Sequence, residues 1–157
     1  MLLFMEKKFQ KKNMITIEDA LLIAVNTHNR QKDLDNLPVI LHPIRVGLRG
    51  KNEEEIITGI LHDVVEDSPY TFDRLIESGV DDKIIEPLKL LTHDKKMEYD
   101  EYLNRLINSK NKLALTVKLN DLSDNLSRND RSTKQKEKIY KKHKNALERI
   151  KSALYST

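Results

Sequence analysis

The 157-residue sequence is 38% hydrophobic and 34% charged, with four glycines, four prolines and a formal net charge of +3. Its length fits one domain over residues 1–157, and its composition predicts a soluble, all-α protein and excludes a disordered or fibrous chain. The absence of cysteine excludes disulfides, thiolate zinc sites and cysteine nucleophiles, so any metal must be held by histidines and carboxylates.

The chain begins with a short apolar stretch, residues 1–5, and continues with apolar residues at a spacing near 3.6. The stretch is too short for a signal peptide or a membrane span, so we expect a cytoplasmic protein with no membrane partner. The spacing predicts helices and no substantial sheet. Capping pairs at Thr16, Asn52 and Ser132 mark three of the helix starts. The expected helices cover about 17–29, 43–49, 53–65, 71–78, 82–93, 98–109, 112–127 and 132–153, with Pro87 expected to kink or split the fifth.

The C-terminal residues 128–157 are strongly basic, with ten lysines or arginines against three acidic residues. Such a charge could steer a polyanion toward the protein. However, the stripe of Ile139, Leu147, Ile150 and Leu154 favours a helix with one packed face and one solvated face. Because the chain has no tryptophan and no known nucleic-acid-binding motif, we do not expect a nucleic-acid partner.

Four polar residues lie in or directly after the second half of the apolar helix predicted at 53–65. They are His62, Asp63, Glu66 and Asp67. Residues four apart share a helix face, so these side chains project into adjoining space. Burying so much charge is unfavourable unless it is paired or bound to a metal. A solvated helix end is the alternative interpretation, and the spacing alone does not decide between the two.

Two further polar residues lie in apolar surroundings. His42 follows the apolar run 39–41, and Asp121 follows the mostly apolar run 115–119 within the same predicted helix. Each taken singly is most simply a hydrogen-bonded core residue. Together with His62 and Asp63 they supply two imidazoles and two carboxylates, a donor set that suits a divalent first-row metal with open positions for water and substrate.

Three segments, in this order, resemble the H…HD…D signature of HD-domain hydrolases. They are Leu41-His42-Pro43, Leu61-His62-Asp63-Val64-Val65-Glu66-Asp67 and Val117-Lys118-Leu119-Asn120-Asp121-Leu122-Ser123-Asp124-Asn125. The Glu66-Asp67 pair narrows the resemblance to the alarmone-hydrolase branch, meaning the hydrolase half of RelA/SpoT enzymes and small alarmone hydrolases. The resemblance covers roughly residues 16–128. It implies an HD-domain bundle of about seven to nine helices, followed here by the basic helix at about 132–153.

The resemblance implies roles for individual residues. The metal ligands would be His42, His62, Asp63 and Asp121, and the ion would be Mn²⁺, with other divalent cations as alternatives. Glu66 and Asp67 would orient or deprotonate the attacking water. The implied reaction is (p)ppGpp hydrolysis, in which metal-activated water releases pyrophosphate from the 3′ position of a guanosine tetra- or pentaphosphate. The implied substrate-binding residues are Asn125, at the nucleotide sugar and phosphates, with His28 and Gln31, which match the family before the His-Pro motif.

The irregular segment 29–38 departs from the family's pattern, and loops of this length in a compact domain are often functional. Asp33 and Leu34 stand where the family has an Arg-Lys pair that helps to hold the purine nucleotide. The candidates to supply the missing positive charge are Arg30, Lys32, Lys95 and Lys118. The sequence therefore supports the catalytic chemistry better than the identity of the substrate.

Two alternatives to an alarmone hydrolase stay open. An HD-domain phosphatase acting on another nucleotide, such as a nucleoside monophosphate or the 2′-phosphate of NADPH, would use the same metal and water. A non-catalytic nucleotide-binding module would keep the metal for structure, but two further carboxylates at Glu66 and Asp67 would then be unfavourable without benefit. In each case the partner is a small nucleotide, and the sequence predicts no oligomeric state.

Overall fold

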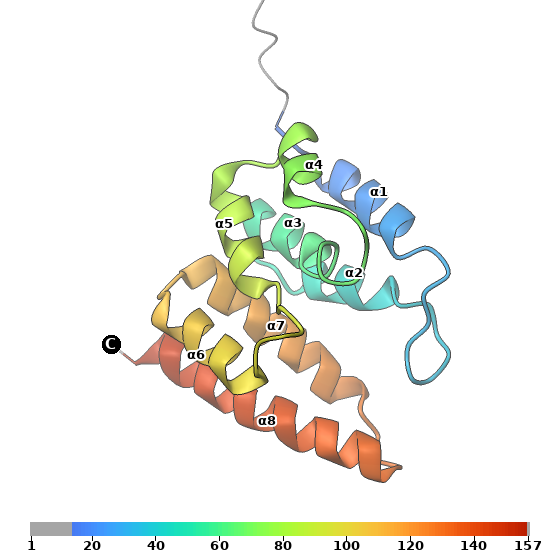
Figure 1. Ribbon diagram of the computed structural model, residues 1–157, viewed down its shortest axis with the longest axis vertical. Coiled ribbons are helices and arrows are strands. Elements are labelled where there is room, and N and C mark those ends of the chain that lie inside the picture. The colour runs from blue at the N-terminus through green and yellow to red at the C-terminus, as the bar shows by residue number, and fades with distance from the viewer. Residues whose placement is uncertain (1–13, 157) are drawn as a thin grey trace, which may run out of the picture.

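A computed structural model of the protein describes residues 14–156, and within this range it contains eight helices and no strand. The helices are α1 (Ile17–Thr27), α2 (Leu41–Leu48), α3 (Glu53–Leu61), α4 (Phe72–Glu77), α5 (Asp82–Leu91), α6 (Tyr99–Asn108), α7 (Lys112–Arg128) and α8 (Lys134–Tyr155). The prediction of an all-helical fold is confirmed (Figure 1). None of these helices is long and apolar enough to cross a membrane, and the apolar stretch 1–5 lies outside the described residues.

Side-chain caps explain where several helices begin. Thr16 Oγ1 accepts the Asp19 amide at 3.1 Å while the Asp19 carboxylate accepts the Thr16 amide at 3.1 Å, which is the predicted capping box. Asn52 caps α3 through its side chain, which accepts the Glu55 amide at 2.9 Å. The predicted cap at Ser132 is wrong, because the side chain of the next residue, Thr133, caps α8.

Helix α3 ends at Leu61, before the predicted end near residue 65. Residues 62–66 form turns instead, although the Asp67 amide still donates to the Asp63 carbonyl at 3.0 Å and keeps one helix-like turn. The prediction that His62 and Glu66 share the face of a regular helix is therefore wrong in its geometry. The ends of α1 and α5 also come two residues earlier than predicted, and Pro87 lies inside α5 without splitting it.

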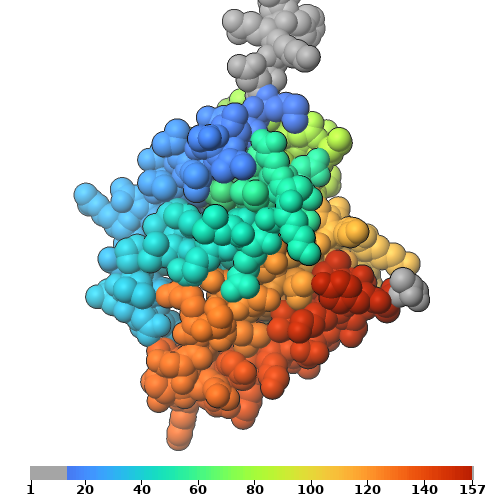
Figure 2. All heavy atoms as spheres, turned by 180° about the vertical axis from the view of Figure 1, so that it is seen from behind, coloured from blue at the N-terminus to red at the C-terminus, as the bar shows by residue number. Residues whose placement is uncertain are grey.

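The helices pack around two clusters of buried side chains. One lies among α1, α3, α4 and α5, and the other joins α2 and the end of α5 to α6, α7 and α8. Figure 1 shows α7 and α8 side by side along one end of the molecule, with α1 to α5 at the other. From behind, the turquoise segments of α2 and α3 lie between blue α1 and the orange-to-red α7 and α8 (Figure 2).

Helices α2, α3 and α7 contact one another pairwise, and the first two cross very closely. A Cβ atom added at Gly59 of α3 would lie 3.0 Å from both the Cα and the N atoms of Gly47 of α2. The absence of a side chain at Gly59 therefore lets the two backbones touch. This crossing brings the start of α2 and the end of α3 against the middle of α7.

Candidate metal centre

The four predicted metal ligands lie together where α2, α3 and α7 meet. His42 is the second residue of α2, His62 and Asp63 follow the last residue of α3, and Asp121 lies within α7. Three of them, His42, His62 and Asp63, each offer a ligand atom within 4.8 Å of the others. The fourth, Asp121, is buried and faces both imidazoles.

The distances between these ligand atoms fit one shared cation. His42 Nε2 lies 3.0 Å from Asp121 Oδ1 and 3.8 Å from Asp63 Oδ2. His62 Nε2 lies 3.1 Å from Asp63 Oδ2 and 3.6 Å from Asp121 Oδ1. Ligands that bind one ion at about 2.0–2.2 Å lie roughly 3 to 3.5 Å apart, so only small shifts would be needed to close on an ion.

The His62 ring is oriented so that one of its nitrogens could bind a cation. Its Nδ1 lies 2.6 Å from the Gly59 carbonyl oxygen, and because a carbonyl only accepts, Nδ1 carries a proton. The other nitrogen, Nε2, is buried and has no well-formed hydrogen bond within residues 14–156. It faces two carboxylates, so it must either take a second proton or give its lone pair to a metal. The donor set of imidazole nitrogen and carboxylate oxygen suits Mn²⁺, Zn²⁺ or Fe²⁺.

The pKa values of the clustered side chains also favour a positive charge at this site. Burial alone would lower the pKa of His62, but the carboxylates of Asp63 and Asp121 outweigh it and hold that pKa well above its usual value. Burial would raise the pKa of Asp121, but Lys118 and the two histidines hold it well below the usual range. These shifts favour the ionised form of the carboxylates and the protonated form of the imidazoles, and a divalent cation would supply that positive charge in place of the protons.

Behind His42, a second layer of residues fixes the orientation of its ring. His42 Nδ1 lies 2.7 Å from Asp124 Oδ2, and Arg45 Nε donates to Asp124 Oδ1 at 2.8 Å. Although burial opposes it, these hydrogen bonds lower the pKa of Asp124 to about 2. A carboxylate on the far nitrogen of a histidine turns the other nitrogen toward the metal. Sequence reasoning assigned Asp124 and Arg45 no role, although Asp124 lies three residues after Asp121 on the same helix.

Glu66 and Asp67 extend the cluster from the turn after α3. One carboxylate oxygen from each of Asp63, Glu66 and Asp67 lies within 4.8 Å of the others. Glu66 is half-buried, and its Oε1 accepts the His93 amide at 2.6 Å. Burial, followed by the nearby charges of Asp63 and Asp67, raises the pKa of Glu66 despite that hydrogen bond. Burial and Asp63 raise the pKa of Asp67 as well, so both carboxylates hold a proton more readily than ordinary ones.

The cluster opens into a cavity of about 270 Å³. Besides the ligands and the acidic pair, it is lined by Leu91, His93, Tyr99, Tyr102, Lys118, Asn125, Lys142 and His143. The last two come from α8, and Lys142 Nζ lies 3.9 Å from the centre of the Tyr99 ring. Sequence reasoning gave α8 no part in the site, because nothing in its basic pattern indicates which lysine faces a cavity.

The predicted substrate-binding residues are not all at the cavity. Asn125 lines it and donates to Asp121 Oδ1 at 2.9 Å. Lys118 also lines it, but its ammonium group already donates to Asp121 Oδ2 at 2.8 Å. Lys95 is exposed and lies outside the lining, although its charge acts on the pKa of Asp67.

His28 and Gln31 lie behind the Glu66-Asp67 turn and outside the lining of the cavity. His28 is only 2% exposed, and its Nδ1 lies 3.0 Å from Gln31 Oε1. Gln31 Nε2 in turn donates to the backbone carbonyl of Asp67 at 2.9 Å. In this structure the two residues brace the turn that carries the acidic pair.

The fold is that of an HD-domain hydrolase. A solved structure described as a metazoan ortholog of SpoT that hydrolyzes ppGpp superimposes with a TM-score of 0.71, covering 90% of this chain and 86% of that one at 24% sequence identity. No family model matches the chain. At this level of identity the superposition establishes the shared fold.

Comparison of the sequences, in addition to the fold, identifies named relatives of the chain. The chain is 28% identical over 154 residues to the protein named "Probable guanosine-3′,5′-bis(diphosphate) 3′-pyrophosphohydrolase" of Mycoplasma pneumoniae. This alignment covers 87% of this chain and 21% of the relative. It is 30% identical over 119 residues to the guanosine-3′,5′-bis(diphosphate) 3′-pyrophosphohydrolase of Aquifex aeolicus, covering 70% of this chain and 17% of that protein. The chain is thus homologous to SpoT-type ppGpp hydrolases over most of its length, and it spans about a fifth of the length of these curated relatives.

Proposed function

We propose that the protein is a metal-dependent phosphohydrolase that removes pyrophosphate from the 3′ position of guanosine 3′,5′-bis(diphosphate). The observation that carries the proposal is the cluster of His42, His62, Asp63 and Asp121 beside the half-buried Glu66, in a chain homologous to ppGpp hydrolases. The four residues would hold the ion, and Mn²⁺ is the proposed ion.

The chemistry follows from the two kinds of carboxylate in the site. A bound divalent cation lowers the pKa of a water molecule from about 15.7 toward 7 and stabilises charge on a phosphoryl oxygen. Glu66 receives the proton of the attacking water, because the His93 amide fixes Oε1 and leaves Oε2 as the acceptor. The water oxygen forms a bond to the phosphorus atom that carries the ribose 3′ oxygen. The bond between this phosphorus and the 3′ oxygen breaks, and the 3′ oxygen takes up the proton that Glu66 received. The products are GDP and pyrophosphate.

Other residues of the chain hold the substrate and the acidic pair. Lys142 gives the cavity a cation that no carboxylate pairs with in the described part of the chain, so we assign it to the substrate phosphates. Lys118 remains with Asp121 and stabilises that carboxylate in its ionised form. His28 and Gln31, first expected to bind substrate, act through the Asp67 carbonyl as positioning residues for the turn.

Another nucleotide substrate is the second candidate, favoured by one observation. Asp33 occupies a position of the basic pair expected in this family, and its carboxylate is bound to Arg128 at 3.1 Å rather than available to a ligand. A chain without that basic pair has lost one of the contacts expected to select a purine nucleotide. The same metal and water would then act on a nucleoside monophosphate or on the 2′-phosphate of NADPH.

A substrate panel separates these candidates. The purified protein is incubated with Mn²⁺ and with guanosine tetraphosphate, guanosine pentaphosphate, nucleoside monophosphates or NADPH, and the products are identified by chromatography. We expect pyrophosphate with GDP or GTP from the first two, and no release when Mn²⁺ is replaced by a chelator. Release of inorganic phosphate from NADPH or a monophosphate, with the guanosine polyphosphates intact, would overturn the proposed substrate. No turnover of any substrate would favour the binding module.

A further inference from the structure

A buried polar atom without a hydrogen-bond partner is unfavourable for folding, and such atoms often mark the place of a ligand. Four side-chain nitrogen or oxygen atoms are of this kind among residues 14–156. Two of them, His62 Nε2 and Tyr99 Oη, belong to residues that line the metal cavity, meaning the cavity into which the metal cluster opens. The nitrogen of His62 is assigned to the ion. The hydroxyl of Tyr99 is left without a role in the proposed chemistry.

Tyr99 is the first residue of α6, and its hydroxyl points inward. The residue as a whole is half-buried, whereas its hydroxyl oxygen is out of contact with solvent. The ring packs against the rings of His93 and Tyr102, with 5.9 and 5.8 Å between the centroids. A tyrosine near a surface usually keeps its polar tip in water or hydrogen bonded. The ring packing therefore holds an unsatisfied donor at the cavity.

The hydroxyl of Tyr99 lies among the charged groups of the metal cavity. Burial raises the pKa of Tyr99, and the charges of Lys118, Asp121 and Glu66 also act on it. The phenol is therefore neutral near pH 7 and can donate one hydrogen bond. None of these side chains accepts that hydrogen bond, so the donor stays free for a bound molecule.

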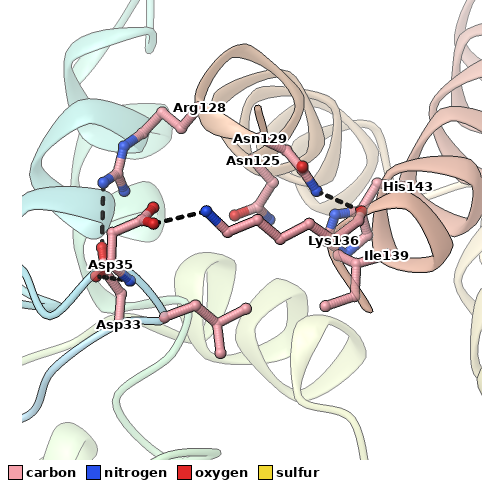
Figure 3. Close-up of a pocket in the computed structure, with 9 residues that line it drawn as sticks. Asp33, Asp35, Asn125, Arg128, Asn129, Lys136, Ile139 and His143 are labelled. Carbon is pink, nitrogen blue, oxygen red and sulfur yellow. Dashed lines mark hydrogen bonds and ion pairs between the residues drawn. The ribbon is translucent and has the colours of Figure 1, made fainter. Parts of the chain in front are cut away.

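Two basic side chains next to the metal cavity are already bound to carboxylates (Figure 3). Arg128 donates to Asp33 Oδ2 at 3.1 Å, and Lys136 Nζ donates to Asp35 Oδ1 at 2.7 Å. Both line a hollow that shares side chains with the metal cavity. Because their charges are paired, they attract a pyrophosphate group less than an unpaired donor does.

Lys142 and Tyr99, by contrast, are two unengaged donors side by side. Lys142 Nζ lies 3.9 Å from the centre of the Tyr99 ring, and no carboxylate pairs with it in the described part of the chain. A phosphate oxygen attracted to this ammonium group would come within reach of the neighbouring phenol. An anion is also the kind of acceptor that makes the strongest hydrogen bond to a neutral O–H group.

We infer that the Tyr99 hydroxyl donates a hydrogen bond to the pyrophosphate group of the substrate, beside Lys142. The inference deepens the proposed function and rests on it for the identity of the substrate. In the free protein the hydroxyl is desolvated and unsatisfied, so it lowers stability. A bound pyrophosphate group supplies the acceptor. The same oxygen atom therefore destabilises the free protein and strengthens substrate binding.

Tyr99→Phe removes only the hydroxyl and separates this role from a structural one. We expect the Tm of the free variant, measured without added metal or nucleotide, to equal or exceed that of the wild type. Tyr102→Phe is the comparison, because the Tyr102 hydroxyl donates to the Leu91 carbonyl at 2.7 Å and its loss should lower Tm. A Tm that falls in Tyr99→Phe as it does in Tyr102→Phe would show that the hydroxyl is satisfied within the protein, and would overturn the inference.

Kinetics provide the second measurement. Because the lost hydrogen bond is to a charged group, we expect KM for guanosine tetraphosphate to rise about tenfold in Tyr99→Phe. The inhibition constant of inorganic pyrophosphate should rise by the same factor. Tyr70→Phe is the matched control, since its hydroxyl lies 3.2 Å from Ser78 Oγ at an exposed place outside the cavity. Both constants should be unchanged in the control, and unchanged constants in Tyr99→Phe would contradict the assignment.

NMR tests the contact without turnover. The full chain, labelled with ¹³C at the tyrosine Cζ atoms, is titrated with inorganic pyrophosphate in the presence of Mg²⁺, which is diamagnetic. We expect the signal that is lost in Tyr99→Phe to shift and the Tyr70 signal to stay in place. An unmoved Tyr99 signal at millimolar pyrophosphate would overturn the inference. If the wild type hydrolysed no nucleotide, the proposed function would fail while the NMR titration still decided the contact.

Discussion

Among single residues, Glu66 differs from Asp63 and Asp121 in the direction in which its surroundings shift the pKa of its carboxylate. Burial would raise the pKa of Asp63 and Asp121, but His62 beside Asp63, and Lys118 with the two imidazoles beside Asp121, outweigh it and lower both pKa values. Glu66 faces the His93 amide and other carboxylates, and burial raises its pKa. A carboxylate with a lowered pKa favours the ionised form that a metal ligand needs, whereas one with a raised pKa takes up a proton more readily.

Glu66→Gln should therefore separate metal binding from turnover. The amide is nearly the same size but cannot accept the proton of water, so we expect activity to fall about 10²- to 10⁴-fold. The Mn²⁺ content of the purified variant, measured by atomic absorption, should match that of the wild type. Loss of the ion in this variant would make Glu66 a metal ligand and our assignment of its role wrong.

The raised pKa values of His42 and His62 give metal binding a definite pH dependence. Burial opposes the shift in both, but the aspartates outweigh it, so protons compete with the metal even above the usual histidine value of 6.5. In the metal-free protein, these pKa values stabilise the fold below pH 6.5, and the contribution is lost as pH rises through the folded-state values. The increase in Tm caused by Mn²⁺ should therefore be larger at pH 8 than at pH 6.5. Thermal unfolding with and without Mn²⁺ measures it, and a larger increase at the lower pH would contradict the protonated cluster.

At the scale of the elements, helix starts were more predictable than helix ends. Thr16 and Asn52 cap their helices as the sequence predicted, because an N-cap is a local hydrogen bond between residues three apart. The end of α3 was mispredicted because Val64 and Val65 continue the apolar pattern, and Val64 is fully buried although it lies in a turn. An apolar pattern indicates which side chains are buried, but it does not distinguish a helix from a tight turn packed in the core.

The candidate site was predictable to the extent that polar residues interrupt apolar runs. His42, His62 and Asp121 could be singled out on that ground, and the structure places them together, while their role as metal ligands stays a prediction. Asp124 behind His42 and Lys142 in the cavity were missed. Their positions depend on how α2, α7 and α8 meet in space, which no local pattern encodes.

The crossing of α2 and α3 gives a prediction about an element. In Gly59→Ala the new Cβ would meet the Gly47 backbone at 3.0 Å, so the helices must separate. We expect a loss of about 1–3 kcal/mol in the free energy of unfolding. We also expect weaker Mn²⁺ binding, because His42 belongs to α2 and His62 directly follows α3, the two helices that would separate. Urea unfolding and a Mn²⁺ titration measure the two effects, with Ser152→Ala at an exposed position of α8 as the control. Unchanged stability would mean that the backbones are not in contact.

At the scale of the whole molecule, the basic helix α8 is both a packing element and a wall of the site. Ala146 and Ile150 are fully buried in the cluster with α6 and α7. Another face carries Lys142 and His143 into the metal cavity, and Lys136 is paired with Asp35 of the loop after α1. The predicted packed face of this helix is confirmed, and its charges are partly used within the protein rather than left to solvent.

Ile150→Ala tests how far α8 belongs to the core. The truncation leaves a cavity between α7 and α8, so we expect the free energy of unfolding to fall by about 2–5 kcal/mol. Leu48→Ala, at a side chain that is 77% exposed, should change it by less than about 0.5 kcal/mol. Urea unfolding followed by circular dichroism should show one transition for each variant. Two separate transitions would contradict the prediction of a single domain.

The central claim is that one divalent cation binds where α2, α3 and α7 meet, and a Mn²⁺ titration followed by electron paramagnetic resonance tests it most directly. The wild type is compared with His62→Ala and Asp63→Ala, each checked for native helix content by circular dichroism. We expect one bound ion per chain in the wild type and none in either variant, because each substitution removes a ligand from the cluster. Wild-type binding in both variants, or no binding by the wild type at millimolar Mn²⁺, would contradict the claim.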